Sequence, residues 1–143
     1  GVTDSTVLLG FYHSKESMTS NPSQSFGLPR SFLGVGVEGP SREGFYFAPL
    51  YRVNGDGQGH AHGKATPRIL PDGRPHEWSL EYSPTGDGEI TVTLDRRSVR
   101  LGLKKGHKAT GARFDRFGLV TTWIDGNGQL IYFDDLTYTC KQD

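Results

Sequence analysis

Three runs of alternating residues within positions 76–103 constrain the fold of this chain more than any other feature of its sequence. Apolar side chains recur at every second position of each run: Trp78, Leu80 and Tyr82; Ile90, Val92 and Leu94; Val99, Leu101 and Leu103. A period of two is typical of strands with one buried face. The linkers 83–88 and 95–97 contain Asp or Gly, which favour turns. Positions 76–103 therefore predict an antiparallel meander that covers a core on one side.

Further apolar or alternating runs before and after the meander predict additional strands. They cover residues 6–12, 31–38, 45–51, 114–123 and 129–139, with Gly- or Pro-rich segments between several of them. The last run changes parity after Phe133, and a β-bulge at Asp134 and Asp135 would return the residues on both sides to the core. No long segment has the 3.6-residue period of a helix. We therefore predict an all-β chain folded as an antiparallel β-sandwich.

Length and charge limit the classes of protein to consider. The chain has 143 residues, and we expect one domain over 1–143, with the C-terminal part of a longer chain as the alternative. Lys and Arg together number 16, as do Asp and Glu, so no net field attracts nucleic acid or an anionic membrane. No apolar run approaches the roughly 20 residues of a membrane span. The single cysteine, Cys140, forms neither an internal disulfide nor a zinc knuckle.

The meander and the last predicted strand resemble the concanavalin A-like lectin/glucanase superfamily. The matching segments are HEW at 76–78, LEY at 80–82, ITVTLD at 90–95 and IYFDDL at 131–136, which mark consecutive strands there. Arg96 replaces the usual turn glycine, which affects only the hairpin type. The match covers about the C-terminal half of the chain. It implies a jelly-roll topology, a polysaccharide or oligosaccharide as ligand, and a secreted or extracytoplasmic protein whose signal peptide lies outside this sequence.

Several aromatic and basic residues are candidates for binding that polysaccharide. Tyr46 is out of phase with Phe45 and Phe47, which predicts a ring on the exposed face. Tyr stacks on sugar rings, and Arg binds carboxylate or sulfate in a fork. The alternative is that the aromatic residues belong to the core or to a sheet edge. The candidate ligand-binding set is Arg42, Tyr46, Tyr51, Arg52, His60, His62 and Trp123.

Two groups of residues are candidates for binding a metal. Asp134 and Asp135 offer adjacent carboxylates at the predicted bulge, which suits a structural Ca²⁺; the alternative is one solvated Asp and one bonded to the backbone. His60 and His62 face the same way in extended backbone and could bind one transition metal, or simply line a ligand groove. A third ligand would be needed, with His13, His76 and Asp56 as candidates.

The sequence favours binding over catalysis. The E-x-D-x-x-E string of laminarinase-like relatives is missing, and Glu77 and Glu81 would lie about 13 Å apart on a strand, too far for a glycosidase pair. We therefore expect a non-catalytic, polysaccharide-binding module. A polysaccharide lyase or other small carbohydrate-active enzyme using Arg, Tyr and His is the alternative, and a domain without a sugar site is the third possibility.

Overall fold

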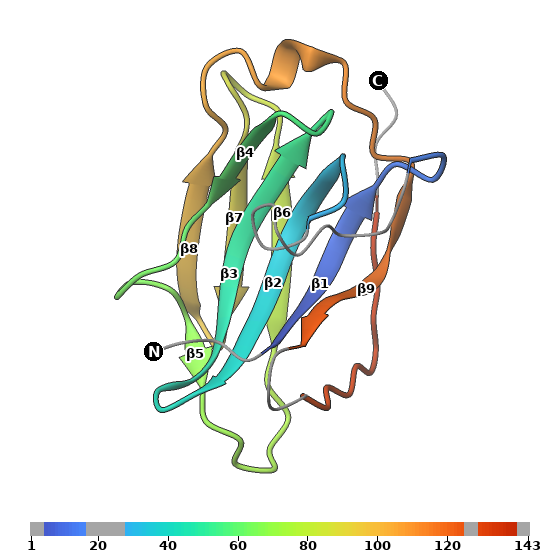
Figure 1. Ribbon diagram of the computed structural model, residues 1–143. Helices are drawn as coiled ribbons and strands as arrows, with labels where there is room; N and C mark the ends of the chain where they lie inside the picture. Colours follow the sequence, from blue (N-terminus) through green and yellow to red (C-terminus); the bar gives the residue numbers. More distant parts are fainter. Residues whose placement is uncertain (1–4, 17–27, 125–128, 140–143) are drawn as a thin grey trace.

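Two antiparallel sheets make up the computed structural model, which describes residues 5–16, 28–124 and 129–139 and, within residues 120–124, the backbone alone (Figure 1). The larger sheet has the order β4-β3-β2-β1-β9, with β5 paired to β3, and the smaller has the order β6-β7-β8. Among the described residues, no helix has the length and hydropathy of a membrane span. The strands are β1 (Ser5–Tyr12), β2 (Phe32–Ser41), β3 (Gly44–Val53), β4 (Gly57–His60), β5 (Arg68–Ile69), β6 (Trp78–Ser83), β7 (Glu89–Leu94), β8 (Arg97–Gly102) and β9 (Arg116–Ile124).

The smaller sheet confirms the predicted meander. Strand β7 pairs with β6 on one side and with β8 on the other. Its alternating residues Ile90, Val92 and Leu94 are buried against the larger sheet. The link to β8 is a two-residue turn in which Asp95 and Arg96 have φ of 46° and 69°, the left-handed values that a tight hairpin requires. The period-two pattern therefore identified the three strands and the face that packs on the larger sheet, except that Tyr82 is 37% exposed.

Strands β1, β2 and β3 of the larger sheet are buried on both faces. Their inner face packs on the smaller sheet through residues such as Leu9, Val35 and Tyr51. On the outer face Leu8, Phe32 and Leu50 form a second cluster with Leu28. Because much of both faces is covered, β1 and β3 read as nearly continuous apolar runs, whereas β2 alternates apolar residues with glycines.

Gly10 and Gly34 allow β1 and β2 to lie close together on the outer face. The two residues are register partners, and a Cβ added to Gly10 would lie 2.4 Å from the Leu33 carbonyl oxygen and 2.6 Å from Gly34 Cα. No side chain fits at these distances unless the strands separate. The glycines on this face of residues 31–38 therefore serve tight packing of the sheet.

The prediction of a strand over residues 129–139, with a bulge at Asp134 and Asp135, is wrong. Residues 129–139 have no regular strand assignment, although Ile131 and Phe133 pack against the inner core as expected. Asp135 has φ of 50° and donates its N–H to Asp134 Oδ1, so the chain bends there without returning to the core. Leu136 is 42% and Tyr138 60% exposed, and Tyr138 stacks on Phe117 at 4.8 Å between ring centres.

Gly10→Ala should destabilise the protein by about 1–3 kcal/mol, because the new methyl group meets backbone atoms that cannot move independently. Gly102→Ala is the matched control, since Gly102 also lies in a strand but its added Cβ meets nothing within 4 Å. Urea unfolding of both variants measures the difference. Equal free energies of unfolding would contradict the close approach of β1 and β2.

His76 should make stability depend on pH. Its Nδ1 lies 2.5 Å from Asp95 Oδ2 and its Nε2 3.1 Å from Asp72 Oδ1. The hydrogen bond with Asp95 raises the pKa of His76, and the same bond lowers the pKa of Asp95. The His76 contribution is complete below its ordinary pKa of 6.5 and is lost as the pH rises through the raised value. The Asp95 contribution is present above its ordinary pKa of 3.8 and is lost as the pH falls through the lowered value.

The loss of melting temperature caused by His76→Gln should therefore be largest between pH 3.8 and 6.5 and should shrink as the pH rises above that window. Thermal unfolding of both proteins across that range measures it. Asp95→Asn is the reference background, in which the effect of His76→Gln should vary less with pH. An effect of constant size in the native background would contradict the ion pair.

Candidate metal centre on the outer face of the larger sheet

A row of residues crosses the outer face of the larger sheet at Glu38. The pairings run from Thr6 of β1 through Glu38 of β2 and Tyr46 of β3 to Arg68 of β5. Directly paired residues of an antiparallel sheet point to the same face. Glu38 therefore lies in the middle of the sheet with Tyr46 and Arg68 on one side of it. A carboxylate at this place needs polar partners above the sheet.

His60 and His62 supply those partners from the edge of the sheet. His60 ends β4, where it pairs with Leu50, and the N–H of Ala61 donates to the Pro49 carbonyl at 3.0 Å. The intervening outer-face positions hold the small pair Gly36 and Ala48. A Cβ on Gly36 would lie 2.7 Å from Leu50 Cδ2 and 3.5 Å from Glu38 Oε1. The absence of a side chain at Gly36 therefore makes room for the Leu50 side chain, whereas 3.5 Å from Glu38 Oε1 is an ordinary contact.

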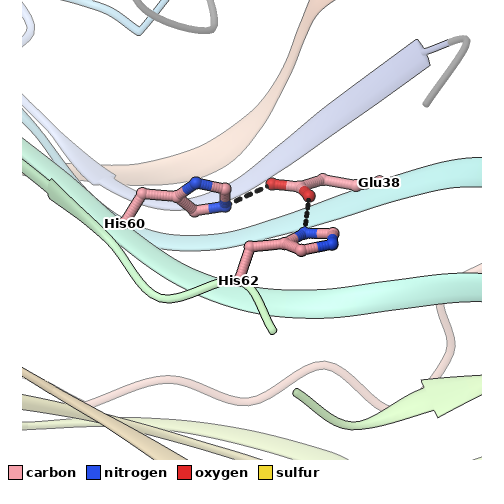
Figure 2. Close-up of side chains that lie close together, drawn as sticks. All are labelled: Glu38, His60 and His62. Carbon is pink, nitrogen blue, oxygen red and sulfur yellow. Dashed lines mark hydrogen bonds and ion pairs between the residues drawn. The ribbon is translucent and has the colours of Figure 1, made fainter. Parts of the chain in front are cut away.

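The two imidazoles hold one oxygen each of the Glu38 carboxylate (Figure 2). His60 Nε2 lies 2.6 Å from Oε1, and His62 Nδ1 lies 2.6 Å from Oε2. The Glu38 side chain is 2% exposed, that of His60 17% and that of His62 33%. The cluster is thus closed at the sheet and opens to solvent on the His62 side.

Burial of this carboxylate requires compensation. An ionised carboxylate removed from water is costly unless hydrogen bonds or opposite charges replace its hydration. The contact of His62 Nδ1 with Oε2 has hydrogen-bond geometry, which places the imidazole proton on Nδ1 when the carboxylate is ionised. Protons shared with histidines, or a cation, can therefore balance the charge of Glu38.

Tyr46 forms one wall of the cluster. Its ring centre is 4.6 Å from that of His62, and the Arg68 guanidinium carbon lies 5.8 Å from the Tyr46 ring centre. The Tyr46 hydroxyl donates to Glu43, which raises the pKa of Tyr46, and the same bond, with the Arg68 charge, lowers the pKa of Glu43. A phenol held in this way resists deprotonation, so Tyr46 is poorly suited to act as the base of a lyase.

Three residues of the predicted ligand set meet at this cluster, namely Tyr46, His60 and His62. Tyr46 faces away from the inner core, as its phase predicts, but it is buried rather than exposed. Arg42 is exposed in the turn between β2 and β3. The backbone of Trp123 pairs with Thr6 at the end of the Glu38 row, and its side chain lies outside the described residues.

The other two predicted residues are structural. Tyr51 is fully buried on the inner face, where its hydroxyl contacts His107 Nδ1 at 2.8 Å and accepts the N–H of Lys104 at 3.0 Å. The Arg52 guanidinium donates to the carbonyls of Leu28 and Gly55. Tyr51 therefore packs in the core, as the alternative for these aromatic residues expected, because the parity of β3 turns its ring to the inner face.

The metal predictions have different outcomes. Among the described residues, one group of three or more His, Cys, Asp or Glu side chains has donor atoms within 4.8 Å of one another, and it consists of Glu38, His60 and His62. The pairing of the two histidines was predicted, but their third partner is Glu38, not His13, His76 or Asp56. Asp134 and Asp135 are both exposed and belong to no such group.

A sequence signal for Glu38 exists in the run at 31–38. Glu38 has the same parity as Gly34 and Gly36, so it falls on the face opposite Val35 and Val37. A charged residue that comes after two glycines on one face of a strand indicates a polar site where the sheet otherwise has no side chains. The sequence could not indicate that His60 reaches it, because the contact depends on the register of β4 against β3.

Comparison with protein-family models, with curated proteins and with solved structures finds no match to this chain.

Proposed function

We propose that the protein binds a divalent transition-metal ion through Glu38, His60 and His62. The observation that carries the proposal is the convergence of two imidazole nitrogens on a buried carboxylate, with all donor atoms within 4.8 Å. Two histidines and one carboxylate are a recurrent ligand set for zinc and for non-haem iron. A bound ion would also replace the lost hydration of Glu38.

The donor chemistry selects the kind of ion. Imidazole suits Zn²⁺, Co²⁺, Ni²⁺ and Cu²⁺, whereas Ca²⁺ requires six to eight oxygen ligands. Two ligands about 2.05 Å from a tetrahedral ion lie about 3.3 Å apart, so the 2.6 Å contacts would lengthen by about 0.7 Å on binding. His60 and His62 lie at the end of β4 and just beyond it, where small movements are possible without disturbing the core.

Zn²⁺ or Co²⁺ at a hundredfold excess over its dissociation constant should stabilise the native protein by about 2.7 kcal/mol. Calorimetric titration and thermal unfolding with and without the ion measure affinity and stabilisation. Glu38→Gln, His60→Gln and His62→Gln should each weaken binding at least tenfold, because each removes one ligand of three.

The matched control is Asp134→Asn with Asp135→Asn, which removes two carboxylates outside the cluster. This variant should bind Zn²⁺ as the native protein does. The same variant tests the structural Ca²⁺ expected from the sequence, because loss of a Ca²⁺-dependent stabilisation would locate calcium at these aspartates. Native-like Zn²⁺ affinity in all three cluster variants would contradict the proposed centre.

Polysaccharide binding is the second candidate function. It is supported by the row across the outer face, in which Tyr46, Arg68 and the backbone of Trp123 share one line with Glu38, and by the exposed Arg42. This second proposal includes a jelly-roll topology of the concanavalin A-like kind and a secreted protein. An antiparallel sandwich is compatible with both. A role as a polysaccharide lyase or other carbohydrate-active enzyme is supported by the residue types alone.

Acidic polysaccharide cast into a native gel should slow the migration of the protein, and Arg42→Gln should reduce the retardation by about twofold to fivefold. Arg100→Gln is the control, because Arg100 is also exposed but lies on the smaller sheet, 3.6 Å from Glu89. Unchanged migration in acidic and neutral polysaccharides alike would contradict this second function.

A further inference from the structure

We infer that the ion held by Glu38, His60 and His62 keeps an open coordination position that binds the carboxylate group of a ligand, with Arg68 as its cationic neighbour. The inference rests on the proposed metal site and adds the chemical class that the site takes. It is built from three observations: the number of ligands, the direction in which the cluster opens, and the charges around it.

The number of ligands leaves the ion incompletely coordinated. Among the described residues the cluster offers three side chains, whereas structural zinc sites are closed by four protein ligands. Sites with three protein ligands bind a water or a substrate atom at the next position. A ligand that supplies an oxygen donor can therefore replace that water without displacing the protein.

The open position lies on the accessible side of the cluster. Exposure rises from the Glu38 side chain at 2% through His60 at 17% to His62 at 33%. The sheet closes the Glu38 side, so a ligand enters past His62. Tyr46 lies against His62 on this side, and Arg68 lies against Tyr46. A ligand bound to the ion thus lies beside the Tyr46 ring, and the Arg68 guanidinium lies against that same ring.

The charges favour an anion. A divalent ion on one carboxylate and two neutral imidazoles leaves one positive charge in a partly buried site, where it is weakly screened. The nearby charges of Arg68 and Glu43 cancel each other, but their contact is long, 3.7 Å between Nη1 and Oε2, and Glu43 also accepts the Tyr46 hydroxyl. Arg68 is 39% exposed and can turn its planar fork from Glu43 toward the carboxylate of a ligand. A carboxylate offers oxygen donors that suit both the ion and the fork.

Cobalt-loaded protein tests the inference directly, because the visible absorption of Co²⁺ reports its ligands. Acetate should shift the cobalt absorption bands in a saturable manner, while the neutral isostere acetamide at the same concentration should not. Glucuronate and a short galacturonate oligomer then distinguish a free organic acid from an acidic polysaccharide as the source of the carboxylate. Stronger binding of the oligomer than of acetate assigns the site to polysaccharide, and stronger binding of acetate assigns it to small acids.

Arg68→Gln should weaken acetate binding about fivefold without changing cobalt affinity, as expected for loss of a partly exposed charge partner. Arg100→Gln, the same substitution on the other sheet, should leave both unchanged. Failure of the native protein to bind Co²⁺ overturns the proposed metal site itself. A cobalt spectrum insensitive to saturating acetate leaves the metal site standing and overturns this inference, and equal acetate affinity in the two arginine variants overturns the role of Arg68.

Discussion

Burial of both faces of the β1–β2–β3 ladder is the constraint on which the rest of the structure depends. The smaller sheet covers the inner face, and the Leu8–Phe32–Leu50 cluster covers part of the outer face. Strands β1 and β2 approach each other closely at Gly10 and Gly34, where an added Cβ would meet backbone atoms. Any polar group placed on such a strand loses its water, and must find its partners within the protein.

Glu38 is the charged residue for which this constraint is most severe. It is among the most buried side chains of the described residues, and both of its oxygens lie against imidazole nitrogens. A buried polar cluster adds little to the free energy of unfolding, because apolar residues of similar volume would stabilise the fold as well. A bound ligand would account for a carboxylate and two histidines at this place, which is why we propose metal binding and not a purely structural role.

Features that depend on neighbouring residues were predicted from the sequence, whereas features that depend on contacts between distant segments were not. The strands 78–83, 89–94 and 97–102 are each defined by local alternation and by turn residues between them, and all were predicted. Residues 129–139 were predicted less well, since Ile131 and Phe133 face the core but Asp135 adopts a left-handed conformation that the alternation does not encode. The pair His60 and His62 was identified by its spacing, while the sequence left open whether Tyr51 binds a ligand or packs in the core.

The sequence by itself determined the all-β class, the meander and the shared orientation of His60 and His62, because these depend on the two-residue period of a strand and on turn chemistry. Only the tertiary structure decided that Glu38 is their partner and that Tyr51 packs in the core. It also decided that Asp134 and Asp135 lie exposed at the surface, outside this cluster. The physical reason is register. Which residues face each other across β2, β3 and β4 depends on how whole strands align, and no short segment of the chain contains that information.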